Sequence, residues 1–113
     1  MKQGEIWLVN LTPTVGAEIT KTRPCVITSS NEIGILPLKV IAPITDYKTH
    51  YDGLPWMLEI SPNGFNNLSR RSVVDLFQLR SVSNVRLIRN IGKVTAEEFQ
   101  KILYTIKIAF GIY

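Results

Sequence analysis

The sequence predicts a small, mostly antiparallel β-barrel or rolled sheet that ends in one α-helix. Three observations lead to this fold class. Short runs rich in Val and Ile recur along the chain, turns containing Gly, Pro and Asn separate them, and only residues 95–111 show helical periodicity. A length of 113 residues fits a single domain, which we expect to span residues 1–113.

The first three strands are expected at residues 5–11, 23–29 and 38–45. The first two flank a polar loop, 12–22, that contains Gly and Pro and is longer than a simple hairpin turn. Loops of this kind, held by rigid strands, commonly carry binding and catalytic residues. Pro43 lies inside the third strand, and because proline has no N–H to donate, it indicates an edge strand or a bulge.

The second half of the chain is expected to add further short strands. Residues 56–61 alternate apolar and polar side chains, and residues 72–79 form the next apolar run. Residues 80–82 either extend that strand or re-enter the sheet. Residues 83–90 fit a short helix or a strand, and residues 91–94 are expected to form the last strand.

The final element is an α-helix with clear signals at both ends. Thr95 and Glu98 have the spacing of a capping box, in which each side chain accepts a hydrogen bond from the other residue's backbone N–H. Gly111 is placed to end the helix. Apolar residues recur at helical spacing and are expected to pack on the sheet: Phe99, Ile102, Leu103, Ile106 and Phe110.

Composition narrows the function classes. The chain carries 13 Lys and Arg against 9 Asp and Glu, a net charge of +4 that favours a polyanionic partner but also serves solubility alone. Cys25 is the only cysteine, so no internal disulfide and no Cys/His metal cluster is expected, and its apolar neighbours predict a buried thiol. Without an apolar leader or a run of roughly 20 apolar residues, we expect a soluble, cytoplasmic protein with no membrane contact.

Arg23 is the first candidate for function. A guanidinium at the start of a strand, beside Pro24, is an unusual place for a purely structural charge, and its planar fork suits phosphate. The alternative is a salt bridge from Arg23 to Glu18 or Asp46. His50, the only histidine, lies in the polar loop 46–55 and is either a solvated loop residue or a catalytic acid or base.

A basic segment, 70–93, is the second candidate surface. It contains one acid, Asp75, and could follow an RNA or DNA backbone or form an ordinary solvated surface. For Arg86 and Arg89 we prefer the solvated surface. The basic residues are Arg70, Arg71, Arg80, Arg86, Arg89 and Lys93.

Several of these features, in this order, resemble one family over essentially the whole chain. They are the run Gly4–Val9, then Pro13, Gly16 and Glu18, then Arg23-Pro24, then Pro43-Ile44-Thr45, then Gln78–Val82 and the terminal helix. As a set they are similar to the MazF/PemK (Kid) toxins.

The resemblance implies a homodimeric SH3-like barrel that acts as the toxin of a type II toxin–antitoxin pair. Such a toxin is a sequence-specific endoribonuclease that cleaves single-stranded RNA, mainly mRNA, with rRNA and tRNA left open as targets, and it uses no metal or other cofactor. The resemblance also implies a cognate antitoxin whose disordered, acidic C-terminal segment covers the RNA groove. DNA would be contacted only through the antitoxin complex.

The resemblance also assigns residues. Arg23 and Thr45 fall on the family's catalytic Arg and Thr. The RNA-binding positions that it implies are Gly16, Lys21, Gln78 and Arg80.

Two departures from the family affect the general base. Phe77 stands where many members carry an acid, and Asp75, two residues earlier on what we expect to be the same strand face, is a candidate substitute. Ala17 replaces a histidine of the first loop in the Kid type. The proton acceptor therefore stays open among Glu18, Asp75 and His50.

The chemistry is coherent without the family name. In metal-free cleavage the RNA 2′-OH attacks the adjacent phosphate, and the reaction needs a base, a cation for the charged transition state and an acid for the leaving oxygen. Arg23 stays protonated and suits the cation's role better than the base's. Two other functions fit the same fold: a CcdB-like toxin that binds DNA gyrase without nuclease activity, and an inactive RNA-binding barrel.

Overall fold

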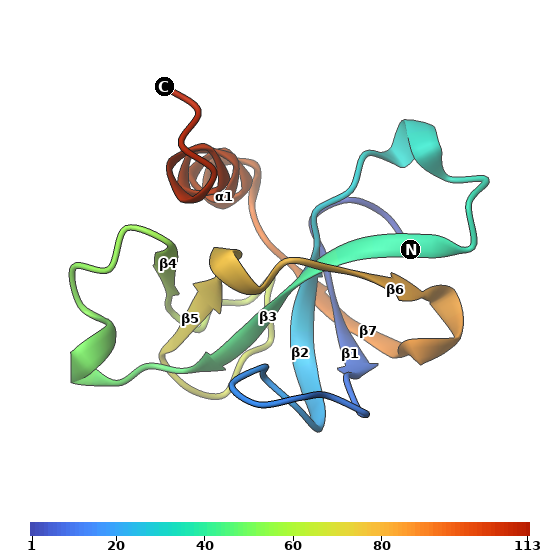
Figure 1. Cartoon of the computed structure of the whole chain (residues 1–113), viewed down its shortest axis with the longest axis horizontal. Coiled ribbons are helices and arrows are strands. Elements are labelled where there is room, and N and C mark those ends of the chain that lie inside the picture. The colour runs from blue at the N-terminus through green and yellow to red at the C-terminus, as the bar shows by residue number, and fades with distance from the viewer.

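The computed structural model describes residues 1–113 as one antiparallel sheet covered at one end by a helix (Figure 1). The predicted fold class, mostly β with a C-terminal helix in a barrel-like roll, is confirmed. The strands are β1 Glu5–Asn10, β2 Thr22–Ile27, β3 Leu38–Asp46, β4 Met57–Ile60, β5 Ser72–Asp75, β6 Arg80–Ser83 and β7 Leu87–Lys93, and the helix is α1 Ala96–Ala109. Four 3₁₀ turns join them: η1 Asn31–Ile33, η2 Thr49–Tyr51, η3 Leu76–Gln78 and η4 Asn84–Arg86.

Strand β3 is the centre of the sheet. It pairs with β2 along one edge, and along its other edge it pairs first with β6 and then with β5. The sheet order is β4-β5-β3-β2-β1-β7, with β6 also on β3. The prediction that Pro43 marks an edge strand or bulge is therefore wrong. Pro43 is tolerated in a central strand because it lies between the residues that pair with β6, up to Ile41, and those that pair with β5, from Ile44.

The predicted strand 72–79 is wrong beyond Asp75. Residues 72–75 pair with one half of β3 and residues 80–83 with the other half, so the chain must step sideways between them. The 3₁₀ turn η3 makes that step, and the Asp75 carboxylate caps it by accepting a 3.0 Å hydrogen bond from the Phe77 N–H. Further along, the ambiguous 83–90 segment contains η4 and the start of β7, and the last strand begins at Leu87 rather than at residue 91.

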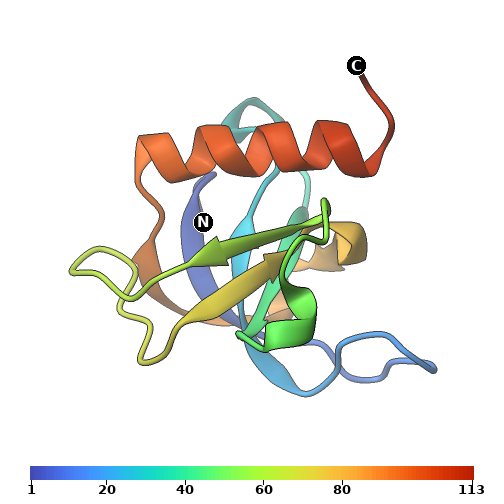
Figure 2. The ribbon, with the colours of Figure 1, turned by 90° about the vertical axis from the view of Figure 1, so that its left-hand side faces the viewer.

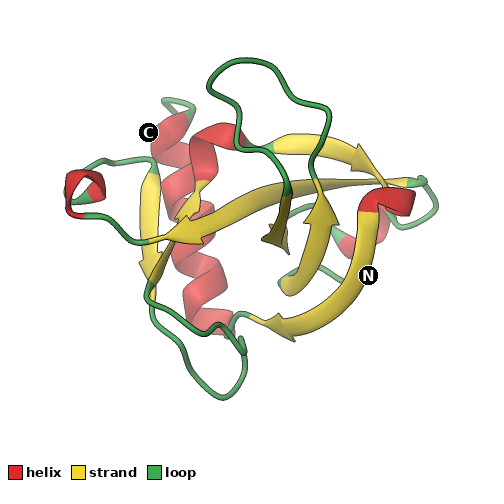
Figure 3. Cartoon of the chain, turned by 90° about the horizontal axis from the view of Figure 1, so that it is seen from below, coloured by secondary structure: helices red, strands yellow, loops and turns green.

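Two apolar clusters lie on opposite faces of the sheet. One contains Ile6, Val26, Ala42, Ile44, Val74 and Ile102 and lies under α1, which crosses the sheet in Figure 2. The other contains Val9, Leu11, Cys25, Ile27, Ile41, Val82 and Leu87. Figure 3 shows from below how the strands that carry these residues curve. Because residues alternate between faces along each strand, neighbours in β2 and β3 belong to different clusters.

Cys25 is fully buried in the second cluster, as predicted. Burial raises the pKa of its thiol to about 12, against the opposing charge of Arg80. A thiol in that environment is not a nucleophile at neutral pH.

The helix begins and ends where the sequence predicts. Thr95 and Glu98 form the capping box, with hydrogen bonds of 3.1 and 2.8 Å. At the other end Gly111, at φ +70°, makes a Schellman closure in which the Ile112 N–H bonds to the Lys107 carbonyl at 2.8 Å.

The apolar stripe of the helix is narrower than predicted. Ile102 is fully buried, and Phe99 and Ile106 pack against the same cluster. Leu103 and Phe110 instead remain exposed, and Phe110 lies at the C-cap, past the last helical residue Ala109. No helix in the structure has both the length and the apolar character needed to cross a membrane.

Candidate active site

The fold brings Arg23 and Thr45 together on neighbouring strands. β2 and β3 are antiparallel and pair from Ile27–Ile41 to Cys25–Pro43, and Arg23 and Thr45 each lie two residues beyond that last pair, at the same end of the two strands. Both residues line one small cavity, with Pro24, Ile44, Asp46, Leu68, Ser69, Arg70 and Ser72.

This cavity is small and polar. Its volume is about 90 Å³, well below the roughly 300–1,000 Å³ of sites for drug-sized ligands. It therefore admits a compact polar group rather than a whole nucleotide. Ser69 and Arg70 contribute to it because the register that pairs Asp46 with Ser72 brings the end of the preceding loop beside β3. No local sequence signal shows that contribution.

Arg23 is free to bind an anion. Its Nε donates a 3.3 Å hydrogen bond to the Thr20 carbonyl, which leaves the terminal guanidinium nitrogens without a protein acceptor. The alternative salt bridges are absent. Asp46 pairs with Arg70 at 3.2 Å, and Glu18 accepts a hydrogen bond from the Val15 N–H at 2.6 Å.

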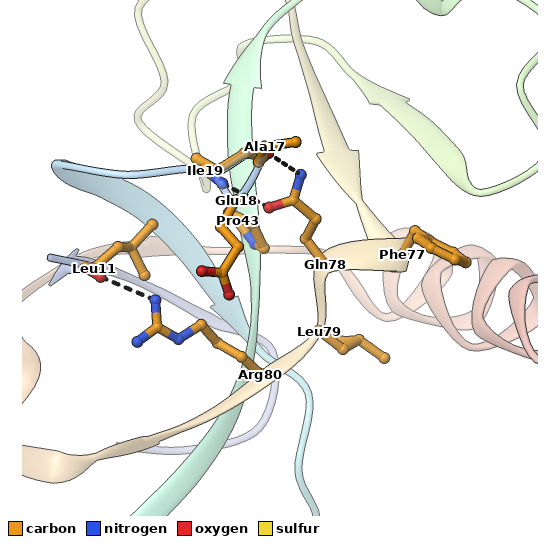
Figure 4. Close-up of a pocket in the computed structure, with 9 residues that line it drawn as sticks. All are labelled: Leu11, Ala17, Glu18, Ile19, Pro43, Phe77, Gln78, Leu79 and Arg80. Atoms are coloured by element: carbon orange, nitrogen blue, oxygen red, sulfur yellow. Dashed lines mark hydrogen bonds between the residues drawn. The ribbon is translucent and has the colours of Figure 1, made fainter. Parts of the chain in front are cut away.

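The loop between β1 and β2, residues 11–21, covers a second cavity on the same sheet face. That cavity measures about 380 Å³ and is lined by Leu11, Ala17, Glu18, Ile19, Pro43, Phe77, Gln78, Leu79 and Arg80 (Figure 4). It adjoins the first because Pro43 is two residues from Thr45, on the same face of β3. Glu18 thus lies in the neighbouring cavity and is not among the residues that line the one with Arg23.

Gln78 holds the 11–21 loop in place. Its Oε1 accepts a 2.7 Å hydrogen bond from the Ile19 N–H, and its Nε2 donates to the Ala17 carbonyl at 3.4 Å (Figure 4). The loop closes on itself through a 2.9 Å bond from the Leu11 N–H to the Lys21 carbonyl. Gly16 and Lys21 are exposed along this loop.

Two arginines anchor the root of the same loop. Arg80 donates a 2.9 Å hydrogen bond to the Leu11 carbonyl. Arg86 donates to the carbonyls of Asn10, at 3.1 Å, and Thr12. The interpretation of Arg86 as a solvated surface residue is therefore wrong. It was missed because its acceptors are more than 70 residues earlier in the chain.

The rest of the basic segment is also largely paired within the protein. Arg71 donates two hydrogen bonds, of 2.7 and 2.8 Å, to Glu59 and lies 3.7 Å from the centroid of the Tyr47 ring. The bonds from Arg71 lower the pKa of the Glu59 carboxyl below its ordinary value. Only Arg89 and Lys93 donate no side-chain hydrogen bond to the protein, so the segment is not one continuous anion-binding face.

Asp75 has a structural position. Its side chain is 4% exposed, and burial raises the pKa of its carboxyl, although hydrogen bonds from Phe77 and Gln78 oppose that shift. Asp75 ends β5 and Phe77 lies in the turn η3, so the two do not share a strand face as expected. Phe77 is 66% exposed and packs its ring 6.1 Å from that of Trp56.

His50 lines neither cavity. It lies exposed in η2, with its ring 4.4 Å from that of Tyr51. This exposed position fits the solvated-loop interpretation. Elsewhere in the chain, no group of three or more His, Cys, Asp or Glu side chains comes together.

Comparison with known proteins adds three findings. The family model for the PemK-like, MazF-like toxin of type II toxin–antitoxin systems matches residues 2–110. The chain is 26% identical to Endoribonuclease MazF9 of Mycobacterium tuberculosis, over 100% of this chain and 98% of that protein, and 29% identical to Endoribonuclease EndoA of Bacillus subtilis, over 99% and 96%. A mycobacterial endoribonuclease solved in complex with its cognate antitoxin has a TM-score of 0.79 at 17% identity, over 100% of this chain and 97% of that one.

Proposed function

The chain belongs to the PemK-like, MazF-like toxins of type II toxin–antitoxin systems. We propose that it is an endoribonuclease that cleaves single-stranded RNA, and that the scissile phosphate binds in the cavity that contains Arg23 and Thr45. The observation that carries the proposal is the pairing of these two residues in one small cavity, with the Arg23 guanidinium free of any ion pair. A scissile phosphate fits that cavity, and the adjoining cavity under the 11–21 loop takes a neighbouring nucleotide.

The proposed reaction needs no cofactor. The ribose 2′-oxygen loses its proton and attacks the adjacent phosphorus, the bond from phosphorus to the 5′-oxygen breaks, and that oxygen takes up a proton from water. The products carry a 2′,3′-cyclic phosphate and a 5′-OH. The free nitrogens of Arg23 donate hydrogen bonds to the phosphate oxygens as negative charge grows on them, and the Thr45 hydroxyl donates another. Their fixed positions on paired strands mean that little reorganisation is needed at the transition state.

The reaction also needs a group that accepts the proton of the 2′-OH. We propose Glu18 as this proton acceptor, because its carboxylate is exposed on the 11–21 loop and lines the cavity beneath that loop. The contacts of Asp75 and His50 described above favour structural and solvated roles. A Glu18→Gln variant should lower kcat and flatten the acid limb of the pH–rate profile if Glu18 acts as the base.

A nuclease assay in excess EDTA tests the proposal. Discrete cuts with 5′-OH ends are expected on a long single-stranded RNA. Arg23→Ala should lower kcat by about 10²–10³, the order found when one transition-state hydrogen-bond donor is removed. Arg89→Ala, a matched loss of an exposed arginine from β7, should leave the rate unchanged.

The Thr45 contribution can be tested with two matched variants. Thr45→Val removes the hydroxyl and keeps the shape, whereas Thr45→Ser keeps the hydroxyl. The serine variant should retain most of the activity that the valine variant loses. Intact RNA with wild-type protein, or gyrase-dependent DNA cleavage in its place, would instead favour the CcdB-like alternative.

The proposed partners follow from the family and the surface. We propose a homodimer, a cognate antitoxin with a disordered acidic segment that occupies the groove, and a cytoplasmic location. Exposed apolar side chains at Ile33, Ile35, Leu36, Leu38 and Val85 support a protein interface. Light scattering after size-exclusion chromatography tests the dimer, and competition between RNA and an acidic peptide tests the antitoxin contact.

A further inference from the structure

An exposed phenyl ring stands at the rim of the cavity beneath the 11–21 loop. Phe77 is among the residues that line that cavity, and it is 66% exposed. Figure 4 shows its ring pointing away from Leu11 and Arg80, on the opposite side of Gln78. The ring therefore offers an open aromatic face at the edge of the cavity to which we assign a nucleotide.

The position of this ring is fixed by the residues around it. Leu76, the residue before Phe77, is fully buried, and its N–H donates a 3.0 Å hydrogen bond to the Trp56 carbonyl. The Phe77 N–H donates to the Asp75 carboxylate at 3.0 Å. The phenyl ring packs against the Trp56 indole, with 6.1 Å between the ring centroids. Because the aromatic surface is already fixed, little conformational entropy is lost when a ligand stacks on it.

Phe77 also lies near the proposed phosphate site. Val73 of β5 pairs with Thr45, and Phe77 follows Val73 by four residues, so their Cα atoms are at most roughly 14 Å apart. The cation Arg80 lines the cavity at whose rim the ring stands. A single RNA strand that binds Arg23 through its scissile phosphate therefore has bases near the Phe77 ring.

The chemistry of a phenyl ring determines what it can recognise in a base. It has no hydrogen-bond donor or acceptor, so it contacts the face of a base and does not read the Watson–Crick edge. Stacking on an aromatic ring holds any base, and it favours purines because their faces are larger. A carboxylate at the same position, as in many members of the family, offers the opposite contact: hydrogen bonds to donors on the base edge.

We infer that Phe77 stacks on a base of the bound RNA near the cleavage site, and that it favours a purine there without requiring one particular base. This inference rests on the proposed ribonuclease function and adds a base-binding residue to it. The other possible occupant of the ring, an apolar surface of a second copy of the chain, is an outcome of the test below.

Binding of non-cleavable RNA tests the inference without relying on catalysis. The probes are short single-stranded oligoadenylate and oligouridylate made of 2′-O-methyl nucleotides, which have no 2′-OH to attack the phosphate. The wild-type protein should bind the oligoadenylate several-fold more tightly. The indole NMR signal of Trp56, whose ring packs on Phe77, should shift on binding, whereas that of Trp7, the other tryptophan, should not.

Matched variants separate the aromatic face from apolar bulk. Phe77→Leu keeps an apolar side chain but has no aromatic face, so it should weaken oligoadenylate binding about tenfold and remove the preference for adenine. Phe77→Tyr should keep both the affinity and the preference. Phe65→Leu, at an exposed phenylalanine in the loop between β4 and β5 that lines neither groove cavity, should change neither. Urea unfolding checks that each variant is folded.

An abasic scan then identifies the base that stacks on the ring. The probe is a 2′-O-methyl strand with the sequence around a mapped cut, with one base removed at each position in turn. At one position the missing base should weaken binding about tenfold in the wild-type protein and hardly at all in Phe77→Leu. Such a dependence of one change on the other is the coupling that a double-mutant cycle measures.

Three results would overturn the inference. The first is equal binding of oligoadenylate by the wild type and Phe77→Leu. The second is an abasic scan in which no position depends on Phe77. The third is a weaker dimer in Phe77→Leu, measured by light scattering, with unchanged RNA binding, which would assign the ring to an interface between copies of the chain. Failure of the proposed function is seen separately, as wild-type protein that binds these strands but leaves long RNA intact.

Discussion

Replacement of Asn66 by alanine should destabilise the protein and disturb the wall of the nuclease cavity. Asn66 is fully buried. Its Oδ1 accepts from the N–H groups of Asn63 and Leu68, at 3.1 and 3.0 Å, and its Nδ2 donates to the Ser61 carbonyl at 2.9 Å. The side chain therefore holds the 61–68 loop, whose end leads directly into the cavity residues Leu68–Arg70.

The magnitude follows from these three hydrogen bonds. Each contributes roughly 0.5–1.5 kcal/mol net, so their loss should lower the free energy of unfolding by about 3 kcal/mol. That is a large fraction of the total stability of a domain of this size, about 6–17 kcal/mol. The melting temperature should fall by roughly 10 °C or more.

Urea unfolding followed by circular dichroism, at fixed protein concentration, provides the measurement. Asn66→Asp keeps the acceptor oxygen but sets a second oxygen against the Ser61 carbonyl, so it should also be destabilising. Gln100→Ala, at an exposed helix position with no side-chain hydrogen bond, should change the free energy of unfolding by less than about 0.5 kcal/mol. A loss below about 1 kcal/mol in Asn66→Ala would refute the argument that this amide holds the loop.

Three further predictions concern the loop anchor, a close backbone approach and a buried acid. Arg86→Ala should lower kcat/KM on RNA by about tenfold, because the 11–21 loop loses two hydrogen bonds at its root. Arg89→Ala should leave kcat/KM unchanged, and equal effects of the two variants would contradict the anchoring role of Arg86. Gly92→Ala should destabilise by about 3 kcal/mol, because its Cβ would lie 2.5 Å from a backbone carbonyl oxygen of the neighbouring loop; unchanged urea unfolding would contradict this. Burial raises the folded-state pKa of Asp75 above its ordinary 3.8. The protonated carboxyl therefore contributes its full stabilisation below pH 3.8, and this contribution is lost as pH rises through the folded-state pKa. Asp75→Asn should therefore gain stability relative to wild type as pH rises from 4 to 7, and a constant difference in urea midpoints over that range would contradict the shift.

Features that depend on near neighbours in the chain were predictable. The capping box of Thr95 and Glu98 and the closure at Gly111 involve residues a few positions apart, so the local pattern specifies their hydrogen bonds. The burial of Cys25 follows from its apolar neighbours in β2. The two strands that carry Arg23 and Thr45 were also predictable, and an antiparallel pairing of them makes contact between these side chains a natural consequence.

Features that depend on register between distant strands were not predictable. β3 pairs with β6 up to Ile41 and with β5 from Ile44, which leaves Pro43 between the two pairings. Because the chain must pass from β5 to β6, β5 ends at Asp75. The same packing turns Arg86 from a surface charge into an anchor for the 11–21 loop. It also places Phe77, which the sequence predicts on a strand, in a turn at the rim of the cavity beneath that loop. A hydrogen bond or a cavity between residues far apart in sequence forms only when the strands pair in one particular register. No local sequence pattern specifies the register between distant strands.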